Sequence, residues 1–120
     1  MTAIMIGDIG GVCPVQATGT FDGRPFYFRA RWSLTISMAD NAGDDPVSVS
    51  TGRISGWYWN GTGNPEFDGN GHTYEDGKHH YGWMELDAAR KCIETVLEAF
   101  SVGDLTGWTR VEGRQGGSLK

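Results

Sequence analysis

Residues 12–38 read VCPVQATGTFDGRPFYFRARWSLTISM, and this stretch decides the fold. Asp22-Gly23 lies near its middle, and this dipeptide favours a two-residue type I′ turn because both turn residues need a positive φ. From Phe26 to Met38 the even-numbered residues are apolar and the odd-numbered residues are polar or amphipathic. Alternation with a period of two is typical of a strand that buries one face. The stretch therefore predicts a β-hairpin.

The turn also predicts which residues of the hairpin lie opposite each other, because a two-residue loop pairs the residues that flank it. Small residues then face large ones on the apolar side, and polar residues face polar ones on the other side. The expected pairs are Phe21–Arg24, Gly19–Phe26, Thr18–Tyr27, Ala17–Phe28, Gln16–Arg29, Val15–Ala30 and Cys13–Trp32. Turn chemistry and hydrophobic pattern agree, so we expect strands over 12–21 and 24–38, the second of them long and bent.

Further strands are expected on both sides of this hairpin. Residues 3–6 predict a short edge strand, followed by a loop over 7–11. The aromatic and β-branched content of 53–60 predicts a third main strand, and Gly56 suggests a bulge within it. Residues 104–111 are expected either to return as a last strand or to pack loosely.

Two loops are long for a chain of this size. Residues 39–51 form an acidic loop in which Val47 and Val49 suggest an edge strand. Residues 60–80 are dense in turn-forming residues, and a loop of roughly 20 residues is often functional or mobile. Within it, a small hairpin is expected between residues 72–74 and 79–81.

One helix is predicted over 88–100, with Asp87 in the N-cap position and Gly103 ending the region in a left-handed turn. Its apolar stripe consists of Ala89, Ile93, Val96, Leu97 and Phe100. The expected fold is α+β, with a twisted antiparallel sheet of four to five strands and one C-terminal helix packed on one face. The 120 residues suit one domain, which we place at 1–112, with a disordered tail over 113–120.

Composition and charge limit the classes of function. A net charge of −5 and a pI near 5.0 argue against a general nucleic-acid binder, which is normally basic. Cys13 and Cys92 fall on predicted apolar faces, so we expect buried free thiols and a cytoplasmic protein rather than a disulfide framework. No segment approaches the ~20 apolar residues of a membrane-spanning helix, so no membrane partner is expected.

No residue pattern indicates catalysis, a metal or a cofactor. His72, His79 and His80 share a loop with Asp68 and two other acidic residues, but their spacing matches no accepted metal motif. A calcium loop that begins at Asp68 would need Gly at its sixth position, where this chain has Thr73. Nucleophile elbows, Walker loops and dinucleotide-binding glycine motifs are missing from the sequence. A metal-assisted enzyme built on the histidine loop is kept as an alternative.

Binding is the better interpretation, and two surfaces are candidates. The leading one is a protein-binding surface made of the two long loops and nearby aromatic residues, with acidic residues that complement a basic partner. Its members are Asp44, Asp45, Tyr58, Glu66, Phe67, Asp68 and Tyr74. Tyr58 belongs to it because strand alternation turns Tyr58 away from Trp57 and Trp59. The alternative is a nucleic-acid-binding sheet face formed by Tyr27, Arg29 and Arg31, which lie on one side of a strand.

The opening segment over 13–31, CPVQA-x-GT-x-DGRPFYFRAR, resembles the start of small uncharacterised proteins from phages and prophages. The segment GWM-x-LD-x-AR over 82–90 is similar to the beginning of their helix. The resemblance implies a phage or prophage origin and implies no catalytic residues. Many anti-CRISPR proteins are small α+β domains that block a host complex by steric occlusion. By that analogy, the expected partner is a host protein or ribonucleoprotein complex in the bacterial cytoplasm.

Overall fold

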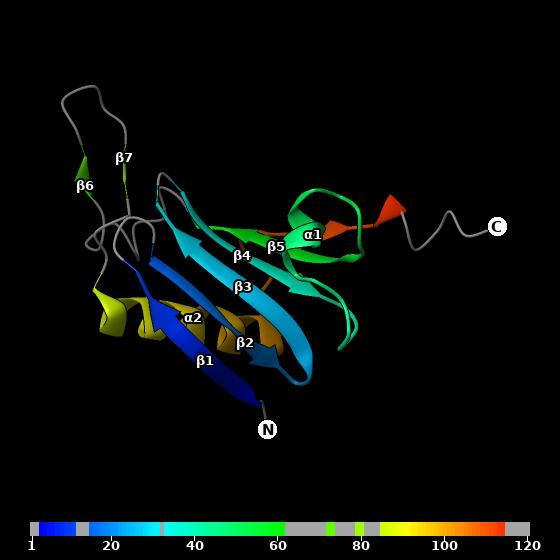
Figure 1. Ribbon diagram of the computed structural model, residues 1–120, viewed down its shortest axis with the longest axis horizontal. Coiled ribbons are helices and arrows are strands. Elements are labelled where there is room, and N and C mark those ends of the chain that lie inside the picture. The colour runs from blue at the N-terminus through cyan, green and yellow to red at the C-terminus, as the bar shows by residue number, and fades with distance from the viewer. Residues whose placement is uncertain are drawn as a thin grey trace.

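The computed structural model describes residues 3–11, 15–31, 33–61, 72–73, 79–80 and 85–114, with only the backbone described for 72–73 and 79–80. Its main feature is a six-stranded antiparallel sheet in the order β1-β2-β3-β4-β5-β8 (Figure 1). The strands are β1 (Ile4–Gly10), β2 (Val15–Phe21), β3 (Arg24–Ala30), β4 (Leu34–Ala39), β5 (Gly56–Asn60) and β8 (Trp108–Val111). An α+β fold with an antiparallel sheet is thus confirmed, with more strands than the four to five expected.

Within the described ranges, two helices accompany the sheet, and a small second sheet is separate from it. Helix α2 (Leu86–Ser101) lies along one side of the sheet, and the single turn α1 (Val47–Ser50) lies on the other (Figure 1). Strands β6 (His72–Thr73) and β7 (His79–His80) pair antiparallel, which confirms the small hairpin expected there. Among the described residues, no helix is both long and apolar enough to span a bilayer.

The β2–β3 hairpin has the register that the sequence predicts. Phe21 pairs with Arg24, Gly19 with Phe26, and the ladder continues to Val15 and Ala30. Asp22 and Gly23 have φ values of 49° and 83°, as a type I′ turn requires. The expected pair of Cys13 and Trp32 lies outside the described residues.

The expected long strand over 24–38 is wrong, because the chain reverses at residues 31–33. Strand β4 pairs back onto β3, with Ala30 opposite Leu34 and Phe26 opposite Met38. A three-residue loop pairs residues of equal parity, so the even-numbered residues stay on the same face after the reversal. The alternation of apolar and polar residues therefore continues through the turn, so the sequence pattern gives no sign of the reversal.

Strand β1 is the expected edge strand, but it runs through Gly10, so the loop predicted over 7–11 is wrong. Ile6 pairs with Gly19 and Ile9 with Ala17, so that residues 7 and 8 lie opposite the single residue Thr18. This β-bulge changes the parity of the strand. As a result Ile4, Ile6 and Ile9 all pack against the core.

The strand expected at Val47 and Val49 is also wrong, because these residues form α1. Asp45 Oδ1 accepts a hydrogen bond of 3.0 Å from the Val47 N–H and starts the turn. Val49 is fully buried and packs over Gly56, where an added Cβ would lie 2.8 Å from Val49 Cγ2. Gly56 pairs regularly with Ala39, so the expected bulge is absent and close packing explains the glycine.

Helix α2 supplies the apolar stripe that faces the sheet. Its buried residues are Ala89, Cys92, Ile93, Val96 and Leu97, and they form one cluster with the even-numbered apolar residues of β3 and β4. Cys92 is buried and forms no disulfide, as expected, and Cys13 lies outside the described residues. The helix begins two residues earlier than predicted, with Glu85 rather than Asp87 at the N-cap. Gly103, at φ 90°, follows the helix in the left-handed conformation that was predicted.

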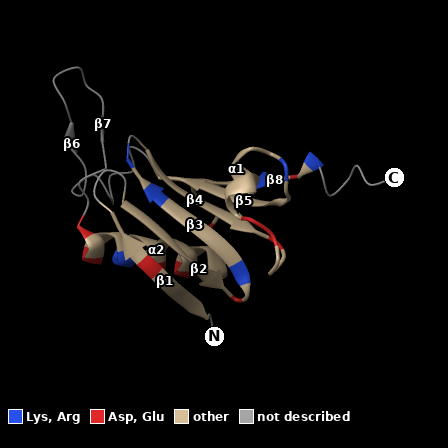
Figure 2. Ribbon diagram, in the orientation of Figure 1, with Lys and Arg blue, Asp and Glu red and all other residues tan. Residues whose placement is uncertain are grey.

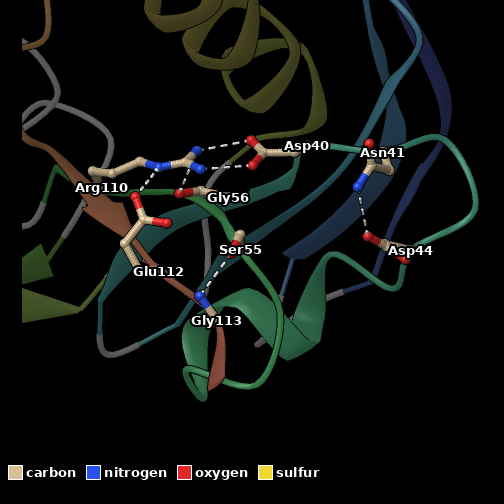
Figure 3. Close-up of polar contacts among 8 residues, drawn as sticks. All are labelled: Asp40, Asn41, Asp44, Ser55, Gly56, Arg110, Glu112 and Gly113. Atoms are coloured by element: carbon tan, nitrogen blue, oxygen red, sulfur yellow. Dashed lines mark hydrogen bonds and ion pairs between the residues drawn. The ribbon is translucent and has the colours of Figure 1, made fainter. Parts of the chain in front are cut away.

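Strand β8 confirms the expected last strand and is held to the rest of the sheet by an arginine. Arg110 Nη1 and Nη2 donate to the two carboxylate oxygens of Asp40 at 2.8 and 2.7 Å, and its Nε donates to Glu112 at 3.0 Å (Figure 3). The Arg110 guanidinium carbon lies 5.5 Å from the centre of the Trp57 ring. After β8, the Gly113 N–H donates to Ser55 Oγ at 2.8 Å (Figure 3). Residues 115–120 of the predicted tail lie outside the described residues.

Candidate interface on the open face of the sheet

The side of the sheet opposite α2, here called the open face, carries polar side chains in rows that run across the strands. Strand pairing aligns the first row as Gln16, Arg29, Thr35 and Asn60. The second row is Thr18, Tyr27, Ser37, Tyr58 and Thr109. Next along the strands, α1 covers Ala39 and Gly56, both of which are buried. The two polar rows therefore form a surface bounded at one end by α1.

Two tyrosines lie in the same row of the open face. Tyr27 is on β3 and Tyr58 is on β5, with Ser37 of β4 between them. Two strand spacings separate their backbones by about 10 Å. Tyr27 Oη donates a hydrogen bond of 2.5 Å to Gln16 Oε1 on β2, so the Tyr27 ring leans away from Tyr58. Both rings are half-buried, which leaves part of each available for contact.

Positive charge on the open face comes from β3 and the turn after it. Arg29 lies in the first row and is exposed, and Arg31 is exposed just beyond the strand. Within the described part of the chain, neither guanidinium forms a hydrogen bond or an ion pair. In Figure 2, β2 and β4 are tan along their length, and blue on β3 is confined to its two ends. The centre of this face is therefore polar but nearly uncharged.

The structure brings together residues that the sequence placed in two separate hypotheses. Tyr58, from the protein-binding set, shares the open face with Tyr27 and Arg29 from the nucleic-acid-binding set, and Arg31 lies at the end of that face. The alternation that separates Tyr58 from Trp57 and Trp59 is confirmed, because both tryptophans pack with the core. Thr35 and Thr109 also belong to this surface. Nothing in the sequence pattern identified either of them as a candidate site residue.

Asp44 and Asp45, which the sequence placed in the protein-binding set, form hydrogen bonds within their own loop. Asp44 Oδ2 accepts a hydrogen bond of 3.4 Å from Asn41 Nδ2 (Figure 3), and Asp45 Oδ1 accepts one of 3.0 Å from the backbone N–H of Val47, the first residue of α1. Neither forms a hydrogen bond with a residue of the two polar rows. The other predicted site residues, Glu66, Phe67, Asp68 and Tyr74, lie outside the described residues.

Two carboxyl groups with structural contacts have lowered pKa values. The pKa of Asp40 lies below its usual value of 3.8, chiefly because its carboxylate accepts hydrogen bonds from Arg110. The pKa of Asp104 is also lowered, first by a hydrogen bond from the Thr106 hydroxyl and then by one from the Thr106 backbone. Sequence reasoning missed the pair of Asp40 and Arg110, which are 70 residues apart.

The chemistry available on the open face is hydrogen bonding and aromatic contact. Hydroxyls, amides, phenols and one guanidinium are the groups that it presents. Among the described residues, no three His, Cys, Asp or Glu side chains gather closely enough to hold a metal ion. Apart from the backbone of 72–73 and 79–80, the histidine loop lies outside the described residues.

Comparison of the chain with protein-family models, curated proteins and solved structures finds no match.

Proposed function

We propose that this protein is a non-enzymatic binding module that recognises a protein partner through the open face. The observation that carries the proposal is the cross-strand row in which Tyr27 and Tyr58 are half-buried, with exposed Thr18 and Thr109 at the two ends of the row. Ser37, between the two tyrosines, is buried. Tyrosine supplies a large contact area at a low cost in conformational entropy, and small polar residues supply adaptable hydrogen bonds. The same combination is typical of protein-binding surfaces of antibodies.

A protein partner suits the charges better than a nucleic acid. The chain has a net charge of −5, and the open face offers Arg29 with Arg31 beside it. Strong binding to nucleic acid normally needs several phosphate contacts from Lys or Arg. Single-stranded nucleic acid is the second candidate ligand, because Tyr27 and Arg29 on one face can stack a base and contact a phosphate.

The resemblance to phage and prophage proteins suggests the kind of partner. We infer a host protein or ribonucleoprotein complex of the bacterial cytoplasm, in particular a defence complex such as CRISPR-Cas. Steric occlusion is the expected mode of inhibition. A sheet face backed by the core of the protein is preorganised, so little conformational entropy is lost when it covers a partner surface.

Alanine variants of the two tyrosines test the proposal. A tagged wild-type protein captures its partner from a nuclease-treated bacterial lysate, and the partner is then purified and titrated. Tyr58→Ala and Tyr27→Ala are each expected to weaken binding by roughly thirty-fold, which corresponds to about 2 kcal/mol for an aromatic anchor. Lys91→Ala, on an exposed position of α2, is the matched control and should bind like the wild type. Circular dichroism verifies that each variant is folded. Wild-type affinity in both tyrosine variants would remove the open face from consideration.

Salt dependence separates the second candidate from the first. Fluorescence anisotropy with mixed-sequence single-stranded DNA and RNA oligonucleotides measures nucleic-acid binding directly. A nucleic-acid module would bind them and lose affinity steeply between about 50 and 200 mM salt. Its affinity would also fall in Arg29→Ala and Arg31→Ala. A protein-binding module is expected to bind neither oligonucleotide at about 150 mM salt.

A further inference from the structure

The outer edge of β1 carries backbone groups that no described strand pairs. Strand β1 is the first strand of the sheet order, so β2 is the only described strand that lies beside it. Strand edges of this kind are sites for pairing with another chain unless they are protected. The segment over residues 3–7, AIMIG, contains no charged residue and no proline, and Met5 is 68% exposed.

The hydrogen-bond pattern shows which groups of β1 point outward. The Asp22 N–H donates to the Ala3 carbonyl at 2.8 Å, so the backbone of Ala3 points toward β2. In an antiparallel ladder, inward-pointing and outward-pointing residues alternate. The N–H and C=O groups of Ile4 and Ile6 therefore point away from the sheet, and those of Met5 point into it.

The two edges of the sheet differ in their protection. At the opposite edge, β8 has only four residues and carries Arg110, whose ion pairs hold Asp40 and Glu112 beside it. On β1, the bulge at residues 7–8 and the charge of Asp8 interrupt the strand. Bulges and charged residues prevent edge pairing. The interruption leaves Ile4 to Ile6 as the unprotected part of β1.

We propose that a second copy of this chain pairs with β1, so that the protein forms a symmetric dimer with an antiparallel β1–β1 contact centred on Met5. Ile4 of one protomer then exchanges hydrogen bonds with Ile6 of its partner, and the reverse pair forms by symmetry. This register satisfies the outward groups of both residues in both protomers. A twofold contact of this kind needs no other ligand, because the same segment is complementary to itself.

The position of the bulge supports a short symmetric contact over the addition of a longer foreign strand. Pairing centred on Met5 ends at Gly7, where the bulge begins. The segment over residues 3–7 carries no charge, so it provides no electrostatic preference for a different chain. Because the twofold axis runs perpendicular to the sheet, both open faces lie on the same side of the dimer. Two such faces can engage a repetitive or symmetric partner with higher avidity than one.

Cysteine cross-linking tests the register. Met5 lies opposite its symmetry mate in a non-hydrogen-bonded pair, where Cα atoms are about 4.5 Å apart, a distance that a disulfide spans. In a Cys13→Ser background, Met5→Cys is expected to form a disulfide-linked dimer under mild oxidation, seen on a non-reducing gel. Thr20→Cys is the matched control, because Thr20 lies beside Met5 on β2. Its symmetry mate is three strand spacings away, about 14 Å, so no cross-link is expected. Cys92 is buried and stays reduced in both variants.

Analytical ultracentrifugation tests the dimer without cross-linking. Wild-type protein and Met5→Leu are expected to sediment as dimers that dissociate on dilution. Met5→Lys brings two ammonium groups together at the twofold axis and should raise the dissociation constant at least tenfold, with the circular dichroism spectrum unchanged. A wild-type protein that sediments as a monomer at about 100 µM would overturn the proposal. Equal cross-linking of Thr20→Cys and Met5→Cys would overturn the register and with it the proposed contact.

Discussion

At the scale of single residues, glycine positions are set by neighbours that are distant in the chain. A Cβ added to Gly56 would lie 2.1 Å from the Met38 carbonyl oxygen and 2.8 Å from Val49 Cγ2. A Cβ added to Gly19 would lie 2.1 Å from the Met5 carbonyl oxygen. The backbone φ angle of neither glycine is positive. Close packing, rather than backbone conformation, therefore explains why both positions are glycine.

Gly56→Ala is therefore expected to destabilise the protein strongly. The added methyl group must displace backbone of β4 or the α1 turn, and overpacking of this kind costs roughly 1–3 kcal/mol or more. Gly43→Ala is the matched control, because no atom lies within 4 Å of the position that its Cβ would take. Urea unfolding monitored by tryptophan fluorescence measures both. A change below about 0.5 kcal/mol for Gly56→Ala would contradict the packing of α1 on β5.

The ion pair of Asp40 with Arg110 predicts a pH-dependent contribution to stability. The folded-state pKa of Asp40 is lowered, so its contribution is complete above the ordinary value of 3.8 and is lost as pH falls through the lower, folded-state value. Asp40→Asn is expected to lower the free energy of unfolding by roughly 0.5–1 kcal/mol at pH 7, because the pair is bidentate but partly exposed. The difference from wild type should shrink below pH 3.8.

Urea titrations of wild type and Asp40→Asn at a series of pH values check this dependence. Glu112→Gln serves as the control, since Glu112 contacts the same arginine but its side chain is 78% exposed. Its effect at pH 7 should be smaller than that of Asp40→Asn. A stability difference between wild type and Asp40→Asn that is the same at pH 7 and at pH 2 would rule out the ionic contribution.

At the scale of elements, local pattern predicts strands and helices well but their ends and reversals less well. Residues 47–50 read VSVS and alternate like a strand, yet four residues are too few for the pattern to decide between strand and helical turn. Their burial against Gly56 decides it. At the start of α2, Glu85 has extended backbone angles and makes no side-chain cap, so Asp87 falls within the first turn. Its negative charge is still favourable there, near the positive end of the helix dipole.

The histidine loop allows a prediction about metals. His72, His79 and His80 are spaced in a pattern that matches no accepted metal motif. Tight zinc sites use three or four protein ligands. After incubation with zinc and dialysis, well under one equivalent should remain by elemental analysis. Retention of one equivalent, lost in His72→Ala with His80→Ala, would revive the metal-assisted enzyme.

At the scale of the whole molecule, the two sides of the sheet differ in composition and in role. The side toward α2 holds the core cluster, and the open face holds the polar rows. Neighbouring residues in the chain can therefore differ completely in role. Phe28 is fully buried and Arg29 is exposed, although they are adjacent on β3.

Phe28→Ala and Arg29→Ala should separate stability from binding. Loss of the buried ring is expected to lower the free energy of unfolding by about 3–5 kcal/mol. Arg29→Ala should change it by no more than about 0.5 kcal/mol, as surface substitutions usually do. Thermal and urea unfolding measure the two variants side by side. Destabilisation of Arg29→Ala by more than about 1 kcal/mol would mean that the open face is covered in the folded protein.

Residues near one another in sequence determined the β2–β3 hairpin, its register, the main helix and the antiparallel α+β class. Those features depend on short-range chemistry, namely the Asp22-Gly23 turn and apolar periods of two or 3.6 residues. Contacts between distant segments decided the rest. The reversal at residues 31–33 preserves parity, so only the pairing of β4 with β3 reveals it. The alignment of Tyr27 with Tyr58 likewise exists only because β4 joins β3 to β5. The candidate interface is therefore a product of strand order, which no local pattern in the sequence records.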